Sequence, residues 1–178
     1  NVAPIPKGLH NHPSLQTLRL EECREELTGI ETLLTSDKSK ITQVIVSFQG
    51  NCFLEPAVRL SRNTLLALAR CTRLTKLHIS NCELSRDCVR QLWNVLRSNP
   101  KLQSLGLSRT RLLNSCLIEF AQALYYNVSI QELDLSWNDL DGMASATLIR
   151  DIVRRNKGIT KLDLTGNEFG GTPGAVQC

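Results

Sequence analysis

Apolar residues recur along the chain in one fixed arrangement, which is clearest in the segment 129–140. There a repeat begins at Ile130, with apolar residues at its first, fourth, sixth and eleventh places and a small polar residue, Asn138, at its ninth. The same arrangement begins at Leu15, Gln43, Leu74, Leu102, Ile130 and Ile159. Successive starts are 28, 31, 28, 28 and 29 residues apart. Self-similarity at this period predicts a solenoid.

The fourth and sixth places are two residues apart, so in a strand their side chains point to the same face, and the places between them point to the other. The polar residue at the ninth place is expected to turn the chain out of the strand. Stacked in register, such side chains can hydrogen-bond the loop backbone of neighbouring repeats. The residues at this place are Cys23, Asn51, Cys82, Thr110, Asn138 and Asn167.

A helical pattern follows each of the first five predicted strands. In the third repeat, Ser85 is a candidate N-cap and Asn99-Pro100 a stop signal. The second repeat carries three extra residues in the region 55–62, which predict a wider turn on one rim. Each helix can bury its apolar stripe only against neighbours, so one repeat alone is not expected to fold. The predicted inward residues are Ile30, Leu33, Leu34, Leu65, Leu68, Ala69, Val89, Leu92, Leu96, Leu117, Phe120, Leu124, Leu148, Ile152 and Val153.

These residues resemble a leucine-rich repeat of the ribonuclease-inhibitor type over roughly residues 14–169. The resemblance implies an α/β solenoid shaped like a horseshoe, with six repeats of about 28 residues, a parallel sheet on the concave face and helices on the convex face. Departures are Gln43, where an aliphatic residue is usual, and Asp37, in place of an inward helix residue. Residues 1–13 are interpreted as an extended lead-in and residues 170–178 as a flexible tail.

Proteins with such repeats include ribonuclease inhibitor, the sensor regions of NACHT-type innate immune receptors, Ran GTPase-activating proteins, tropomodulins and Tonsoku-like replication-repair scaffolds. Their shared use is protein recognition on a curved surface, and fold alone does not choose among them. The resemblance therefore implies a non-enzymatic domain that binds a protein or peptide on its concave surface, with innate immunity and DNA repair both open as contexts. The alternatives are a GTPase-activating module of the Ran type and a structural array that packs against other domains of its own chain.

The composition of the chain argues against several classes of protein. The charges are mixed, with 21 basic and 17 acidic residues and a net charge of +4, so nucleic-acid binding is not favoured. The seven cysteines contain no CxxC, which predicts reduced thiols in the cytoplasm or nucleus. No apolar run approaches ~18 residues, so no membrane span is expected. The chain begins at Asn1 rather than Met, so we expect a piece of a larger protein. The pattern does not determine the oligomeric state.

No catalytic residue, metal site or cofactor is predicted. His10 and His12 have no clear third ligand, so exposure to solvent is favoured over metal binding. His78 is interpreted as a surface residue, because no serine or cysteine can be assigned to it as a nucleophile. Trp93 is expected to cover the seam between two helices, with a convex binding patch as the alternative.

If the strands stack in parallel, residues at equal places form rows about 4.8 Å apart. The third-place row is Thr17, Ile45, Lys76, Ser104, Glu132 and Lys161. The fifth-place row is Arg19, Ser47, His78, Gly106, Asp134 and Asp163. The eighth-place row is Glu22, Gly50, Asn81, Arg109, Trp137 and Gly166. From these rows we predict a partner-binding set that comprises Lys76, His78, Arg109, Glu132, Asp134, Trp137, Lys161 and Asp163.

Trp137 is the strongest candidate anchor within this set, because aromatic and arginine side chains at the centre of an interface are worth ~2 kcal/mol or more. The competing interpretation is that Trp137 packs over its own loop and stacks with Arg109. Asp134 beside Asp163 is a like-charge pair, which destabilises a sheet. A basic partner could offset that repulsion, or Lys161 could neutralise it internally.

Overall fold

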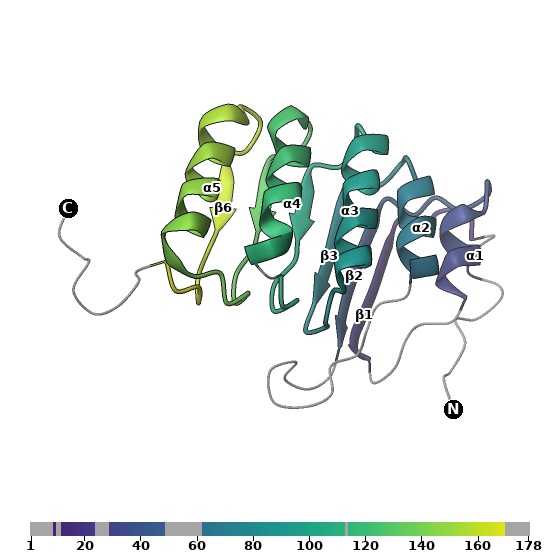
Figure 1. Ribbon diagram of the computed structural model, residues 1–178. Helices are drawn as coiled ribbons and strands as arrows, with labels where there is room; N and C mark the ends of the chain where they lie inside the picture. Colours follow the sequence, from purple (N-terminus) through teal and green to yellow (C-terminus); the bar gives the residue numbers. More distant parts are fainter. Residues whose placement is uncertain (1–8, 10–11, 24–28, 49–61, 113, 170–178) are drawn as a thin grey trace.

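Six strands and five helices alternate along the computed structural model, which describes residues 9, 12–23, 29–48, 62–112 and 114–169 (Figure 1). The strands are β1 (Thr17–Cys23), β2 (Gln43–Phe48), β3 (Lys76–Ser80), β4 (Ser104–Gly106), β5 (Glu132–Asp134) and β6 (Lys161–Asp163). The helices are α1 (Ile30–Thr35), α2 (Arg62–Arg70), α3 (Arg86–Ser98), α4 (Asn114–Tyr126) and α5 (Gly142–Arg155). All neighbouring strands pair in parallel, in chain order from β1 to β6.

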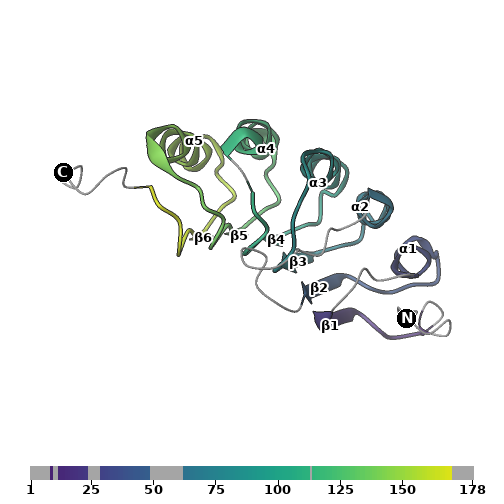
Figure 2. The ribbon, with the colours of Figure 1, turned by 60° about the horizontal axis from the view of Figure 1, so that its bottom comes forward.

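The strands line one side of an arc and the helices lie along the other (Figure 2). Helices are wider than strands, so stacking the two at equal repeat intervals bends the array toward the sheet side. The predicted α/β solenoid, with its sheet on the concave face and its helices on the convex face, is therefore confirmed. The predicted lead-in and tail lie almost wholly outside the described residues, as does the wider turn expected within residues 55–62.

A core built mainly from leucine fills the space between sheet and helices. In the third repeat the first, fourth and sixth places, Leu74, Leu77 and Ile79, are all buried. The corresponding residues of the fifth repeat, Ile130 and Leu135, are also buried. Each strand and helix therefore buries its apolar side against its own repeat and the next, as a solenoid requires.

The register of the second repeat differs from the expected one. Gln43 pairs with Thr17 and Lys76, which are third-place residues, so this repeat begins at Ile41 rather than at Gln43. Ile41 is buried and supplies the aliphatic residue that Gln43 lacked. Val44, Val46 and Phe48 are all buried, and a slip of two residues leaves the same side chains facing inward. The apolar pattern alone therefore could not exclude the slip.

The corrected register changes two of the predicted rows. Ile45 lies in the fifth-place row beside His78, not in the third-place row. Ser47 pairs with Ser80, two residues further along the strands, and so leaves the fifth-place row. Gly50 and Asn51, which were expected at the eighth and ninth places, lie outside the described residues.

The predicted N-cap and stop of α3 are confirmed, whereas the predictions for Val153 and Asp37 are wrong. Ser85 caps α3 by accepting a hydrogen bond from the Cys88 backbone N–H, and the helix ends at Asn99. Val153 was expected to point inward but is half exposed, while Ile149 is buried in its place. Asp37 lies in an exposed turn after α1, so it does not replace an inward helix residue.

A row of asparagines joins the repeats at the edge where the helices end. The side-chain Nδ2 of Asn99 donates to the Cys71 carbonyl over 2.9 Å, and that of Asn127 donates to the Leu96 carbonyl over 3.0 Å. Asn156 repeats the contact by donating to the Leu124 carbonyl over 2.7 Å. Each amide satisfies a carbonyl that the preceding helix end leaves without an intrahelical partner.

Candidate protein-binding surface

The eight predicted site residues lie on β3 to β6 and on the loops that leave β4 and β5. Strand pairing aligns Lys76, Ser104, Glu132 and Lys161 in one row. It aligns His78, Gly106, Asp134 and Asp163 in a second row, two residues further along each strand. Arg109 and Trp137 follow β4 and β5 at the equivalent eighth place.

The eighth place has a left-handed backbone in most repeats. The φ angles are 55° at Glu22, 56° at Asn81, 53° at Arg109, 56° at Trp137 and 71° at Gly166. A residue other than glycine rarely adopts this conformation, so the surrounding loop has to hold it in place. The left-handed turn redirects the chain at the end of each strand. Trp137, which lies in one of these turns, is 46% exposed.

The buried side chain of Asn138 holds the loops that carry Arg109 and Trp137. Its Oδ1 accepts hydrogen bonds from the Thr110 and Leu112 backbone N–H groups over 2.9 and 3.1 Å. Its Nδ2 donates to the Leu107 and Leu135 carbonyls over 2.6 and 3.1 Å. One carboxamide therefore joins the exit of β4 to the exit of β5.

Asn167 repeats this arrangement one strand further along. Its Oδ1 accepts from the Asn138 and Leu140 backbone N–H groups over 3.0 and 3.1 Å. Its Nδ2 donates to the Leu135 and Leu164 carbonyls, both over 2.9 Å. The ninth-place asparagines thus form a ladder beneath the exposed residues, as the small polar residue at that place predicts.

Arg109, Trp137 and Gly166 are stacked across three consecutive repeats. The guanidinium carbon of Arg109 lies 5.1 Å from the ring centre of Trp137, which is within cation–π range. On the other side, the indole covers Gly166 so closely that a Cβ atom there would collide with the ring. The contact with Arg109 is the one that the competing interpretation expected, while Gly166, on which the ring also lies, belongs to the next repeat and not to the loop of Trp137. The indole remains half exposed.

Two aspartates lie side by side on β5 and β6. Asp134 and Asp163 are Cα partners in the sheet. The Oδ1 atom of each accepts a hydrogen bond from the backbone N–H two residues later, Ser136 or Thr165, over 2.9 Å. The bonds from Thr165, and to a smaller extent the charge of Lys161, lower the pKa of Asp163. Among the described residues, neither aspartate forms an ion pair within 4.0 Å.

His78 lies in a hydrogen-bonded row rather than alone on the surface. Its Nε2 is 2.8 Å from the Ser104 hydroxyl, which in turn donates to Glu132 Oε2 over 3.0 Å. Burial lowers the pKa of His78, and the charge of Lys76 adds to this effect. Sequence reasoning assigned no serine to this histidine, so the contact with Ser104 was missed. Since the Ser104 hydroxyl donates its hydrogen bond to Glu132, it accepts one from His78 Nε2–H, which is unlike a serine activated by a histidine base.

A concave hollow of about 330 Å³ opens beside these rows. Of the predicted residues, His78, Arg109 and Asp134 line it, whereas Trp137 and Asp163 do not. Asn81 lines it too and was missed, although it occupies the same eighth place as Arg109 and Trp137. The Asn81 Oδ1 atom is buried and has no hydrogen-bond partner within the described part of the chain. A buried acceptor without a partner is uncommon in folded proteins.

The amino-acid sequence is similar to those of known leucine-rich-repeat proteins. The leucine-rich repeat family model matches residues 126–142, which span the end of α4, β5 and the Trp137 loop. The chain is 28% identical to ribonuclease inhibitor of Sus scrofa over 178 residues, which is 99% of the chain and 38% of that protein. It is 27% identical to human NACHT, LRR and PYD domains-containing protein 14 over 162 residues, which is 90% of the chain and 14% of that protein. The chain therefore spans well under half the length of either relative.

The described residues were also compared with what a metal site and a membrane-spanning helix require. Within the residues that the structure describes, no group of three or more His, Cys, Asp or Glu side chains is arranged to hold a metal ion. The described helices are also all too short or too polar to cross a membrane.

Proposed function

Because the chain is a leucine-rich-repeat protein of the ribonuclease-inhibitor type, and such repeats are protein-interaction modules, we propose that it binds a protein segment on its concave face. The contact centres on Arg109 and Trp137 at the exits of β4 and β5. It extends over the acidic pair Asp134 and Asp163 and the hollow beside His78. Lys76, Glu132 and Lys161 form the polar rim of the same surface. Binding requires no cofactor and no chemical step.

The exposed, stacked indole of Trp137 is the observation that carries this proposal. A half-exposed tryptophan loses little conformational freedom on binding when its loop is already fixed. The ladder formed by Asn138 and Asn167 fixes that loop, and Arg109 holds one face of the ring. A rigid aromatic side chain next to an arginine is the composition typical of interface hot spots.

The acidic pair indicates the charge of the partner. Asp134 and Asp163 lie on adjacent strands, and like charges directly opposite each other destabilise a sheet. A lysine or arginine from a partner placed between them would relieve this repulsion and gain charge-assisted hydrogen bonds. We therefore propose that the bound segment carries at least one basic residue next to an apolar group that covers Trp137.

The thiols support a reducing compartment, such as the cytoplasm or nucleus. The described cysteines Cys23, Cys71, Cys82, Cys88 and Cys116 are present as thiols rather than disulfides. Four of them are buried in the core, and the fifth is half-buried. Cysteines with such surroundings serve as small core residues and need no redox role.

Affinity capture from cell lysate with matched variants tests the proposal. The test variants are Trp137→Ala and Asp134→Arg, and the control is Val153→Ala. Val153 is 49% exposed on α5, close to the 46% of Trp137, but it lies on the helical face. We expect the two concave variants to reduce recovery of the bound protein at least ~10-fold and the control to leave it unchanged.

The outcomes separate the alternatives. If both concave variants recover every partner as well as wild type does, the proposed surface is wrong. A recovered Ran-type GTPase whose GTP hydrolysis the chain accelerates would favour the GTPase-activating role instead. The Sus scrofa relative is named for inhibiting ribonuclease, so a purified ribonuclease is the first defined protein to test.

A further inference from the structure

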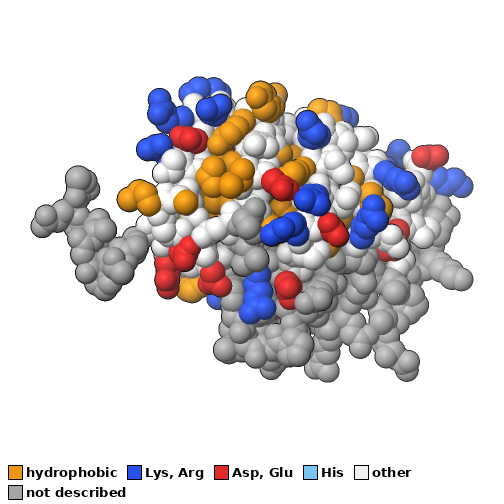
Figure 3. Space-filling model, in the orientation of Figure 1, with side chains coloured by type: hydrophobic (Ala, Val, Ile, Leu, Met, Phe, Trp, Pro, Cys, Tyr) orange, Lys and Arg blue, Asp and Glu red, His pale blue; other side chains and the backbone are white. Residues whose placement is uncertain are grey.

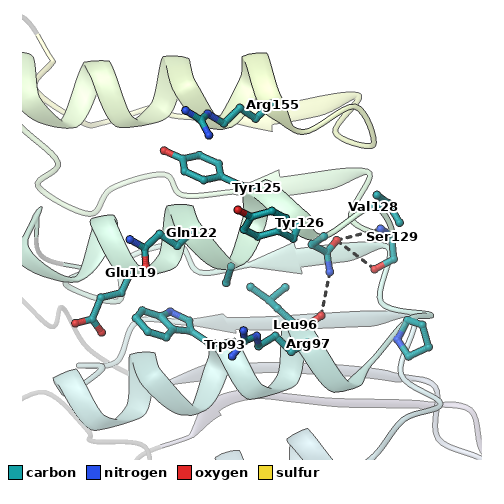
Figure 4. A pocket seen from close by; sticks show the side chains of 13 residues that line it. Trp93, Leu96, Arg97, Glu119, Gln122, Tyr125, Tyr126, Val128, Ser129 and Arg155 are labelled. Atoms are coloured by element: carbon teal, nitrogen blue, oxygen red, sulfur yellow. Dashed lines mark hydrogen bonds between the residues drawn. The ribbon is translucent and has the colours of Figure 1, made fainter.

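A second hollow lies on the convex face, between the C-terminal halves of α3 and α4. Its volume is about 870 Å³. Trp93 and Leu96 line it from α3, and Tyr125 and Tyr126 line it from α4 (Figure 4). None of these four residues belongs to the concave surface. Trp93, Leu96 and Tyr125 give the hollow an aromatic and apolar floor, and the hollow is separate from the site proposed above.

The rim of this hollow exposes large apolar groups that the fold itself does not use. Tyr126 is 86% exposed and Val128 is 83% exposed. In the space-filling view, hydrophobic side chains gather over α4 and α5, with lysine and arginine side chains nearby over the upper end of α5 (Figure 3). An apolar cluster bordered by charged residues is a common property of protein-binding sites.

The charge around the hollow is positive. Arg97 from α3 and Arg155 from α5 line it, and Arg155 lies 4.8 Å from the ring centre of Tyr125. Neither arginine has a carboxylate partner within 4.0 Å among the described residues. The one carboxylate in the lining, Glu119, already pairs with Arg90 over 3.5 Å. Two arginine side chains are therefore available above an apolar floor.

The indole N–H of Trp93 adds a separate observation. Its Nε1 atom is buried and has no hydrogen-bond partner in the described part of the chain. Figure 4 shows Trp93 opposite Glu119 and Gln122, at the seam where α3 meets α4. Buried donors are nearly always paired in proteins, so an acceptor that enters this seam would complete the arrangement.

From these observations we propose that the convex hollow docks an acidic linear segment of another protein. An apolar or aromatic side chain of the segment enters between Trp93 and Tyr126. Carboxylates that flank this side chain pair with Arg97 and Arg155, whose planar guanidinium groups bind carboxylates through two parallel hydrogen bonds. A nucleic acid would need a longer basic track than two arginines above an apolar floor. The site would give the chain two binding faces, with a basic partner on the sheet and an acidic partner on the helices.

Selection from a random peptide display library tests this proposal and does not require the natural partner to be identified. The target is the Trp137→Phe variant, which leaves Trp93 as the only tryptophan, so its fluorescence reports binding of each selected peptide. The competitor is the Trp137→Phe, Arg97→Glu, Arg155→Glu variant. Both arginines are exposed, and circular dichroism with thermal unfolding checks that this variant remains folded.

We expect enriched peptides to carry Asp or Glu around an apolar residue and to change the fluorescence of Trp93. Their affinity should fall roughly 10-fold or more with the charge-reversed variant and should weaken as salt is raised. If no peptide is enriched, or if the enriched peptides lack acidic residues or bind both variants equally, the proposal is wrong. A second copy of the chain in this hollow would instead appear as concentration-dependent dimerisation that Tyr126→Glu abolishes, and this too would overturn it. The proposed concave function fails by a different test, since its variants do not touch this hollow.

Discussion

The exits of β4 and β5 differ from the exit of β1 in how the chain is held. At the C-terminal exits, Asn138 and Asn167 each connect two repeats through both ends of a carboxamide. At the exit of β1, the ninth-place residue is Cys23, and the pairing with β2 shifts register between Leu20 and Cys23. The thiol makes a long contact, of 3.9 Å, to the Glu21 carbonyl. A carboxamide can donate and accept at once, whereas a thiol does both weakly.

This difference indicates why the candidate anchor lies where it does. Trp137 has a left-handed conformation directly before Asn138, and Arg109 has one directly before Thr110, whose backbone N–H and hydroxyl both donate to the Asn138 side chain. Glu22 has the same conformation at the exit of β1 but no asparagine next to it. The more firmly held strand exits therefore lie in the C-terminal half of the sheet, where we propose the binding surface, and variants in the two halves should behave differently.

The largest expected effect comes from removing a core side chain beneath the ladder. Leu135 is fully buried at the sixth place of its repeat. Leu135→Ala should lower the free energy of unfolding by about 2–5 kcal/mol, because a cavity remains where the side chain was. Leu164→Ala is the matched control, at the same place of a repeat where the leucine is only partly buried. Urea unfolding followed by circular dichroism measures both, and equal losses would contradict the assigned repeat register.

The next effect tests the ladder itself. Asn138→Ala leaves the Thr110 and Leu112 N–H groups without their acceptor and removes two donated bonds. Since an unpaired buried polar group costs about 1–3 kcal/mol, we expect a loss of about 2–4 kcal/mol. Cys23→Ala at the equivalent place should cost less than about 1 kcal/mol. If the two variants lose equal stability in the same unfolding assay, the contrast between the two exits is wrong.

The polar residues at the strand exits also determined how well the repeat register could be predicted from the sequence. The asparagines and threonine at the ninth place marked the strand exits correctly in the fourth to sixth repeats. In the second repeat, Val44, Val46 and Phe48 alternate without an internal marker, so a slip of two residues preserved every inward side chain. The error placed Ile45 in the wrong row, and only strand pairing could correct it.

The candidate site was predictable only in part, because its residues were found by place and not by contact. Equal places predicted that Arg109 would stand next to Trp137 and Asp134 next to Asp163. The bond between His78 and Ser104 runs diagonally between rows and depends on rotamers, which the repeat pattern does not encode. The convex hollow depends on gaps between helices, and of its lining the sequence singled out only Trp93 as part of a possible binding patch.

Substitution of Gly106, in the middle of the concave face, tests how tightly the side chains of that face pack. A Cβ atom at Gly106 would lie 2.7 Å from the His78 ring. Gly106→Ala should therefore lower the free energy of unfolding by about 1–3 kcal/mol through overpacking. Adding His78→Ala removes the clash, so a double-mutant cycle should recover most of this loss. Additive losses in the two variants would mean that the ring does not rest on Gly106.

The smallest expected effect is on pH dependence, and it comes from His78. Burial and Lys76 lower its pKa from the ordinary value of 6.5, so the folded protein binds the proton less readily than the unfolded chain. The stability that this histidine contributes is therefore present above pH 6.5 and is lost as pH falls through the folded pKa. His78→Gln should flatten the stability profile in that acidic window. Unfolding of both proteins across this pH range measures the effect, and identical slopes would contradict it.

Site-specific photocross-linking tests most directly whether the concave exit surface binds a protein. A benzoylphenylalanine at position 165 lies next to the Trp137 loop, since the Trp137 N–H donates to the Thr165 carbonyl over 2.7 Å. The same group at position 153 reports on the helical face. We predict a protein adduct from position 165 that disappears when Trp137→Ala is added, and no such adduct from position 153. An adduct formed from position 153 alone, or one from position 165 that survives Trp137→Ala, would contradict binding at the concave exit surface.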